Sequence, residues 1–175
     1  MKQINKYIVE RLHINKDIDS NYYNYHPKTR DVLIKIVDRL IKKRGNNADL
    51  NDIDTSEITD MSKLFFNSNF NGNISEWYVN NVEYMIDMFG ESKFNGDISN
   101  WNVSNVKYMN NMFYESNFNG DISNWDVSKV EEMDTMFYCS KFNGDISNWN
   151  VSNVKNMVGM FYRSPLQKNP PKWYY

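Results

Sequence analysis

Methionine is the first candidate for metal chemistry in this sequence, because its spacing is regular. Two series step by 24 residues: Met85, Met109, Met133 and Met157, and three residues later Met88, Met112, Met136 and Met160. Stacked thioethers are suitable ligands for Cu(I). However, no Cys or His shares their register, and Met commonly fills apolar cores. We therefore expect both series to lie in the core, and we expect no metal and no cofactor.

Carboxylates are the second candidate. Asn-Gly-Asp recurs at Asn95–Asp97, Asn119–Asp121 and Asn143–Asp145, and Asp49–Glu57 is dense in acids. A Ca²⁺ loop of the EF-hand type needs oxygen ligands at fixed positions and a glycine at the sixth. Asp54 stands at that sixth position, and the Asn-Gly-Asp copies lack the spacing altogether. We expect Asx turns here, in which the side chain bonds nearby backbone.

Catalytic groups are sparse. His13 and His26 lie outside the regular part of the chain, and Cys139 is the single cysteine, which excludes an intrachain disulfide. No Ser-His-Asp or Cys-His arrangement and no phosphate-binding glycine loop is present. We expect no catalytic residues and no enzymatic activity.

A 24-residue repeat determines where these residues must lie. Tryptophan marks it at Trp77, Trp101, Trp125 and Trp149, and Phe-Asn-Gly begins at Phe70, Phe94, Phe118 and Phe142. Five units start at Leu50, Ile74, Ile98, Ile122 and Ile146, and a half unit with Trp173 follows. A fixed period of this size is typical of a solenoid, in which each unit buries its apolar face against its neighbours. Such a scaffold favours binding over catalysis.

Each unit reads as a strand followed by a short helix. Its predicted core positions are Ile98, Trp101, Val103, Val106, Met109, Met112, Phe113 and Phe118. The first four match a leucine-rich-repeat template, and Trp101 and Val103 alternate with polar residues as in a strand. The next three fall on one face of a helix, and Gly120 is expected to turn the chain with a positive φ. The sequence predicts an α/β fold: a leucine-rich-repeat-like solenoid of five 24-residue strand–short helix units with an α-helical N-terminal cap.

The domain division follows from where the repeat begins. Residues 1–46 are assigned to an N-terminal helical cap, and residues 47–175 to the solenoid with a terminal capping strand. An amphipathic helix is predicted over Val32–Ile41, with Thr29 as its N-cap and Gly45 just after its end. A shorter helix is expected around Ile4–Leu12.

Charge is divided unevenly between these two parts. Residues 1–46 hold 11 Lys/Arg against 5 Asp/Glu, whereas residues 47–175 hold 9 against 17. The basic segment leaves a nucleic-acid partner open as an alternative. Its cations are not clustered with aromatic residues, so nucleic acid is the less favoured partner.

The repeat resembles the BspA-like leucine-rich-repeat family, whose units read W-[ND]-V-S-x-V-x-x-M-x-x-M-F. The matching segments are WNVSNVKYMNNMF, WDVSKVEEMDTMF and WNVSNVKNMVGMF, with WYVNNVEYMIDMF as a drifted copy, and the resemblance covers about Ala48–Trp173. The segment YHPKTRDVLIKIVDRLIKKRG looks like the leader of short members from gut bacteria and their phages. The resemblance implies surface attachment and binding to host proteins.

Segments that direct export are not visible in the sequence. Residues 1–20 carry charges throughout without an apolar stretch, and no Cys near the start could serve as a lipobox. No stretch is long and apolar enough to span a membrane. A cytoplasmic or phage-encoded protein is therefore favoured over an exported one.

Two surface rows are the candidate interaction residues. Tyr114, Tyr138 and Tyr162 follow the predicted helices, where the polar residues differ between units, and Tyr is common at interfaces. Asn102, Asp126 and Asn150 lie on the regular strand side, which suits a glycan or another sheet. We expect a non-enzymatic protein-interaction or adhesion-type repeat module with a protein partner. The alternatives are a structural subunit of a phage or surface assembly and, second, a nucleic-acid-associated protein.

Overall fold

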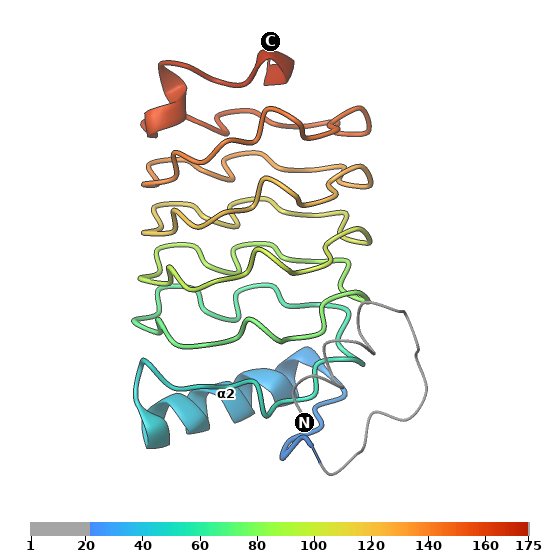
Figure 1. The fold of residues 1–175 in the computed structure, drawn as a ribbon, viewed down its shortest axis with the longest axis vertical. Helices are drawn as coiled ribbons and strands as arrows, with labels where there is room; N and C mark the ends of the chain where they lie inside the picture. Colours follow the sequence, from blue (N-terminus) through green and yellow to red (C-terminus); the bar gives the residue numbers. More distant parts are fainter. Residues whose placement is uncertain (1–21, 175) are drawn as a thin grey trace.

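Repeated circuits of chain stacked along one axis form most of this protein. The computed structural model describes residues 22–174, so the helix expected at Ile4–Leu12 lies outside the described residues, as does His13. Each 24-residue repeat makes one circuit, which we call a rung, and successive rungs lie on one another along the longest axis (Figure 1). The helical elements are α2 (Arg30–Arg44), the 3₁₀ helix η1 (Pro165–Gln167) and the 3₁₀ helix η2 (Lys172–Tyr174).

Backbone hydrogen bonds join each rung to the next. In one column the amides of Met61, Met85, Met109 and Met133 donate to the carbonyls of Tyr84, Tyr108, Glu132 and Asn156, at 2.9–3.0 Å. Parallel bridges follow the same column through Asp60, Tyr84, Tyr108, Glu132 and Asn156. The rungs are thus paired like parallel strands, but only at isolated bridges.

The predicted fold class is wrong. In the described residues the rungs contain no α-helix, and no strand extends beyond a single bridge. The chain is therefore not an α/β leucine-rich-repeat-like solenoid of five 24-residue strand–short helix units with an α-helical N-terminal cap. Each rung is instead a series of turns, such as Trp101 N–H to Ile98 O and Val106 N–H to Val103 O.

Left-handed backbone explains why no helix forms in the Met-rich segment. Asn111 has φ +56° and Glu115 has φ +50°, and both values interrupt an α-helix. The Asn111 amide donates to Asp134 O of the next rung instead of to a carbonyl four residues back. Consecutive β-turns, closed by bonds such as Met112 N–H to Met109 O, place apolar side chains on one side as a helix would. The spacing of Met109, Met112 and Phe113 therefore did not distinguish between the two.

The predicted core positions are confirmed. All eight apolar positions of the unit from Ile98 to Phe118 are buried. Phe113 stacks on its equivalents Phe89 and Phe137 at centroid distances of 5.7 and 5.6 Å. Within the rung, Phe113 and Phe118 lie 4.3 Å apart. Apolar burial therefore continues without a break along the stack.

Tryptophan links the rungs through a second, side-chain hydrogen bond. Each indole N–H donates to a carbonyl of the preceding rung at 2.9–3.2 Å, from Trp77, Trp101, Trp125, Trp149 and Trp173 to Leu50, Ile74, Ile98, Ile122 and Ile146. The indole can therefore be buried with its one donor satisfied.

Glycine is required in the Phe-Asn-Gly segment for a different reason from the one expected. Gly120 does not adopt a positive φ, which among the described glycines occurs at Gly45 and Gly159. A Cβ on Gly120 would lie 2.9 Å from two carbons of the Phe118 ring. The ring packs against this glycine, and any side chain there would displace it.

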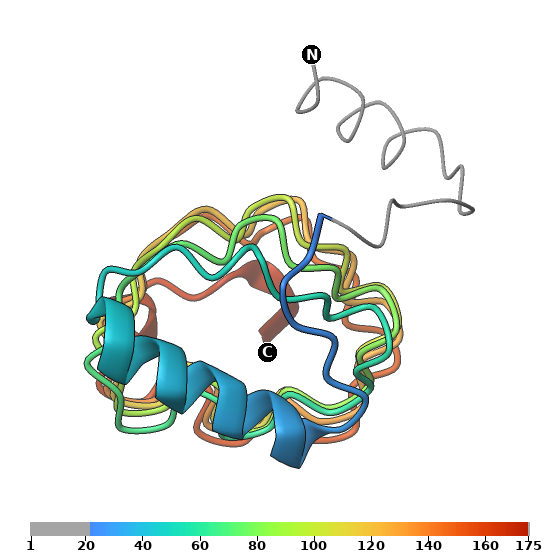
Figure 2. The same cartoon turned by 90° about the horizontal axis from the view of Figure 1, so that it is seen from below.

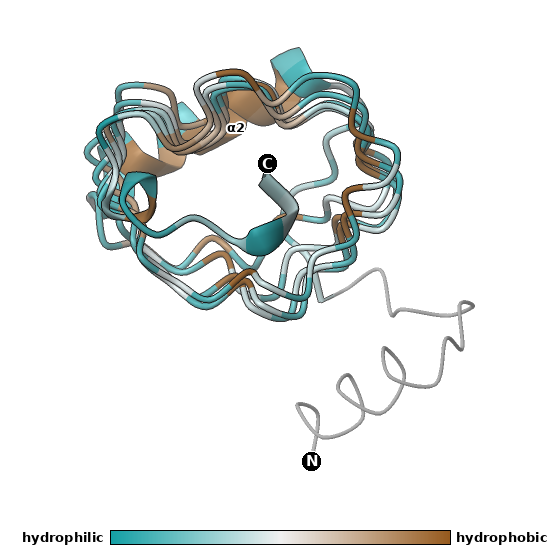
Figure 3. Cartoon of the chain, turned by 90° about the horizontal axis from the view of Figure 1, so that it is seen from above, coloured by the Kyte–Doolittle hydropathy of each residue, from teal (hydrophilic) through white to brown (hydrophobic). Residues whose placement is uncertain are grey.

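The helix α2 lies where the sequence predicts an amphipathic helix. Thr29 Oγ1 accepts a hydrogen bond from Val32 N–H, and Gly45 follows the helix with φ +88°. Its buried residues, Leu33, Val37 and Leu40, join the core of the stack. Seen along the axis, α2 lies against the first rung along one side (Figure 2). Its apolar side faces the stack (Figure 3).

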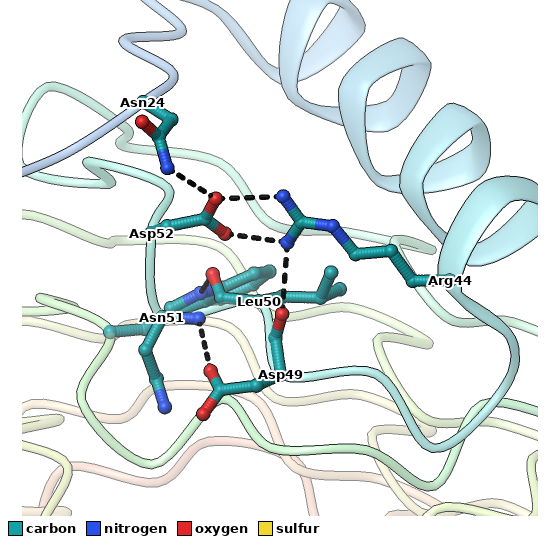
Figure 4. A network of polar contacts seen from close by, with 7 residues as sticks. Asn24, Arg44, Asp49, Leu50, Asn51 and Asp52 are labelled. Atoms are coloured by element: carbon teal, nitrogen blue, oxygen red, sulfur yellow. Dashed lines mark hydrogen bonds and ion pairs between the residues drawn. The ribbon is translucent and has the colours of Figure 1, made fainter.

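A polar network around Asp52 joins three segments at this end (Figure 4). Arg44 donates two hydrogen bonds to the Asp52 carboxylate, each 2.8 Å, and a third to Asp49 O at 3.0 Å. Asn24 Nδ2 donates to Asp52 at 2.8 Å. The hydrogen bonds from Arg44 lower the pKa of Asp52. Asp52 therefore holds α2 and the preceding segment on the first rung while ionised.

Truncating a central tryptophan should cost more than truncating a terminal one. We expect Trp125→Ala to lower the free energy of unfolding by about 3–5 kcal/mol, since both neighbouring rungs line the cavity that it leaves. Trp173, half-exposed in the last described segment, should cost less when changed to Ala. Urea denaturation of both variants measures the difference, and equal losses would contradict nearest-neighbour packing.

The Asp52 network should make stability depend on acid pH. Because folding lowers the pKa of Asp52, its contribution is complete above the unfolded value of about 3.9 and is lost as pH falls through the folded value. We expect Asp52→Asn to cost about 1–2 kcal/mol near neutral pH, with the gap to wild type closing in acid. Urea midpoints over a pH series measure this, with the exposed Asp38→Asn of α2 as control. A gap of constant size throughout the series would refute the role of Asp52.

Candidate interaction surface

The three predicted tyrosines form one stacked row. Tyr138 lies between the other two, with ring centroids 5.1 Å from Tyr114 and 5.1 Å from Tyr162. Each tyrosine precedes a residue with positive φ, namely Glu115, Cys139 and Arg163. Tyr162 is 47% exposed, and the other two are half-buried. One aromatic ring per rung is thus presented at the surface.

The row continues toward α2 in a way that sequence reasoning missed. Gly90 and Phe66 stand 24 and 48 residues before Tyr114. Phe66 is 40% exposed, and a Cβ on Gly90 would lie 3.1 Å from its ring. Phe66 therefore covers the position where Gly90 has no side chain. We call Phe66, Tyr114, Tyr138 and Tyr162 the aromatic row; the 24-residue step could have identified its first member.

Cations lie at both ends of the aromatic row. Lys63 Nζ lies 6.0 Å from the centroid of Phe66, and the Arg163 guanidinium lies 5.9 Å from that of Tyr162. A cation over an aromatic face is attracted by the ring quadrupole. Because the inner rings stack face to face, the row offers ring edges and hydroxyls to a partner more than open faces.

The hydroxyl of Tyr114 stays protonated over the whole physiological range. Its hydrogen bond with Glu115 raises the pKa of Tyr114 to about 12. A protonated phenol both donates and accepts hydrogen bonds. The row can therefore combine apolar contact with polar recognition.

A second tyrosine stack was also missed. Tyr84 and Tyr108 lie 5.1 Å apart at the bridge position of two adjacent rungs. Beside them, Lys107 forms an ion pair with Glu83 at 2.9 Å. Since Glu132 and Asn156 occupy the same position in the next rungs, this stack ends after two rings.

The second predicted row lies at turns. Asn102, Asp126 and Asn150 are exposed, and their side-chain oxygens accept from the amides of Ser104, Ser128 and Ser152 at 3.0–3.2 Å. The hydrogen bonds from Ser128 lower the pKa of Asp126. Each of these side chains thus has one oxygen engaged in fixing the backbone.

The Asn-Gly-Asp segments form the expected Asx turns. Asp97, Asp121 and Asp145 accept from the amides of Ser99, Ser123 and Ser147 at 2.9–3.0 Å. Both methionine series lie in or against the core, as expected. Within residues 22–174, no group of three or more His, Cys, Asp or Glu side chains is arranged to hold a metal ion.

His26, the one histidine among residues 22–174, lies at the N-terminal end of the stack. His26 Nδ1 lies 3.2 Å from Asp54 Oδ2 of the first rung. No helix in the described part of the chain combines the length and apolarity needed to cross a bilayer.

Comparison with known proteins identifies a family. The model of the family described as "Mycoplasma protein of unknown function, DUF285" matches residues 36–138 and 114–174. That family is related to BspA-like repeat proteins, and the match therefore agrees with the resemblance as far as this relationship goes. No curated protein and no solved structure matches the chain. Since the family matches run from within α2 to the last described residue, this protein belongs to the DUF285 family.

Proposed function

We propose that this protein is a non-enzymatic protein-interaction or adhesion-type repeat module that contacts its partner through the aromatic row. The observation that carries the proposal is the stack of partly exposed rings, one per rung, at Tyr114, Tyr138 and Tyr162. Tyrosine is enriched in interfaces, where it supplies a large contact area with few rotatable bonds.

Preorganisation supports this proposal. The backbone that carries the rings is fixed by bonds between rungs, such as Glu115 N–H to Tyr138 O at 2.8 Å. The rings also restrain one another by stacking. Binding would therefore cost little additional side-chain entropy, which is the main loss when a flexible surface is ordered by a partner.

A protein partner is favoured over a glycan at this row. Sugars pack on open aromatic faces, whereas here the inner faces are occupied by neighbouring rings. The alternative row at Asn102, Asp126 and Asn150 is exposed but engaged in turns. It remains the competing surface for a glycan or another sheet.

A nucleic-acid partner receives less support. Several cations near α2 bind the first rungs: Lys28 pairs with Glu57, Arg30 donates to Ser62 O, and Arg44 pairs with Asp52. Part of the basic character of this segment is thus explained by intramolecular docking.

The proposal predicts that the aromatic row controls affinity. A partner is first identified by quantitative pull-down with the wild-type protein, and its dissociation constant is then measured with two variants. We expect the triple change of Tyr114, Tyr138 and Tyr162 to Ser to weaken binding about 30-fold or more, as expected for clustered interface aromatics. The matched triple change of Asn102, Asp126 and Asn150 to Lys should have a smaller effect.

Thermal melts establish that both variants are folded. Loss of binding only in the Asn102, Asp126 and Asn150 variant would reject the aromatic row as the contact surface. Equal affinity of all three proteins would exclude both rows.

A further inference from the structure

Four columns of peptide hydrogen bonds run along the stack in the same direction. In the central rung the amides of Met109, Asn111, Phe113 and Glu115 donate to Glu132 O, Asp134 O, Met136 O and Tyr138 O, at 2.8–3.1 Å. The equivalent amides donate forward in the same way from the first rung, at Met61, Lys63, Phe65 and Asn67. Two columns run the other way through the central rungs, for example Lys107 N–H to Glu83 O and Asn117 N–H to Ser92 O.

Aligned peptide dipoles give the two ends of the stack opposite partial charges. Unpaired N–H groups at one end of such an array attract anions, and unpaired carbonyls at the other end attract cations, as at the termini of a helix. The carbonyl end has a cation in place: Arg30 Nε donates to Ser62 O at 2.6 Å. The N–H end is at the last rung.

Three of the four amides at that end have no acceptor in the part of the chain that the structure describes. In the last rung Arg163 N–H donates to Gln167 Oε1 at 2.7 Å. Met157, Gly159 and Phe161, which occupy the other three column positions, donate their amides to no acceptor in residues 22–174. The neighbouring Val158 is 76% exposed. We call residues 157–163 the open edge.

The described tail covers a side chain of the open edge but supplies no acceptor to the three amides. The Phe161 ring lies 6.1 Å from that of Trp173 and 4.8 Å from that of Tyr174. The rings of Trp173 and Trp149 stack with their centroids 6.4 Å apart. The tail around Trp173 therefore lies above the segment around Trp149 in the last rung. The tail crosses one side of the last rung and ends near the middle (Figure 3).

The charge at this end complements an acidic partner. Residues 146–174 contain no Asp or Glu, although they contain Lys155, Arg163, Lys168 and Lys172. Lys155 pairs with Glu131 of the preceding rung. Arg163, Lys168 and Lys172 are exposed and form no ion pair within the described part of the chain.

We propose that the open edge binds an extended acidic peptide segment of a partner protein. The segment would supply backbone carbonyls to the amides of Met157, Gly159 and Phe161, and carboxylates to Arg163 and the lysines beyond it. Adding an extended segment to an exposed backbone edge is an established mode of peptide recognition. This surface shares Tyr162 with the aromatic row, but the proposal does not rest on the proposed function of that row.

A second copy of this chain fits the edge less well. Both ends of the stack are basic, since exposed Arg39, Lys42 and Lys43 of α2 lie at the opposite end. Copies that met end to end would therefore place like charges together. In a head-to-head pair, the unpaired amides would also face one another without acceptors.

The test uses a short synthetic peptide of alternating glutamate and valine, with a lysine–valine peptide as control. Amide hydrogen exchange followed by NMR reports on the edge directly. In the free protein, the amides of Met157, Gly159 and Phe161 should exchange faster than their equivalents Met133, Thr135 and Phe137, which are hydrogen-bonded. The acidic peptide should slow exchange at these three amides about 10-fold or more, and the lysine peptide should not.

Charge reversal provides the matched comparison. The double change Arg163→Glu and Lys168→Glu should weaken peptide binding about 10-fold or more. Glu91 and Glu115 already occupy the backbone position of Arg163 with positive φ, so glutamate is tolerated there. The control, Lys93→Glu with Lys141→Glu, makes the same charge change at exposed residues of inner rungs and should bind like wild type.

Several results would overturn the proposal. These are protection of the three amides in dilute free protein, peptide binding without their protection, or equal weakening in the control variant. Equal protection by inorganic phosphate would identify a simple anion site instead. Protection that rises with protein concentration, together with dimers in sedimentation, would identify a second copy as the occupant.

Discussion

The hydrogen bond from one rung to the next is the interaction on which the rest of this structure depends. Most of each rung is built from turns, which leave many amides without a partner in their own segment. Those amides find acceptors 23 residues later, as Phe113 N–H does at Met136 O. Buried or half-buried backbone groups must be paired, so the length of each circuit is held to 24 residues. A fixed circuit length stacks equivalent positions on one another. This stacking produces the columns of Trp and Phe and requires a glycine beneath Phe118.

Some backbone strain is accepted to make these bonds. One position of the 24-residue repeat has a positive φ in every rung. It is occupied by Lys63, Asp87, Asn111 and Thr135, and by Gly159 in the last rung. Left-handed backbone costs roughly 1–2 kcal/mol for an ordinary residue, and Thr is β-branched. The bond from Thr135 N–H to Val158 O and the stacked rings nearby offset that cost. The same geometry orients the peptides of four columns in one direction, which gives the stack its unlike ends.

The sequence predicted the period, the core positions and α2 because these depend on residue type. Periodic Trp and Phe require stacked packing, and Thr29 and Gly45 mark the helix ends through their own backbone preferences. The local structure of the rungs was not predictable in this way. Residues as different as Lys63 and Thr135 occupy the left-handed positions, so residue type does not indicate where positive φ occurs. The aromatic row was predicted from Tyr114 onward, whereas Phe66 was missed because the first unit has drifted. The amides of Met157, Gly159 and Phe161, which have no acceptor among residues 22–174, were not predictable, since the side chains do not encode the direction of the backbone hydrogen bonds.

Removal of one complete rung tests this dependence on register most directly. Deleting Ile98–Asp121 joins Asp97 to Ile122, which restores the same Asp–Ile junction and keeps every remaining rung at 24 residues. We expect this variant to unfold in a single cooperative urea transition, with a smaller dependence on urea because less surface is exposed. Deleting only Ile98–Met109 should abolish the single transition, because the shortened circuit cannot pair in register with both of its neighbours and the rungs before and after it are no longer coupled. A complete-rung deletion that loses the single transition as the half-rung deletion does would contradict the dependence of this fold on bonds between neighbouring rungs.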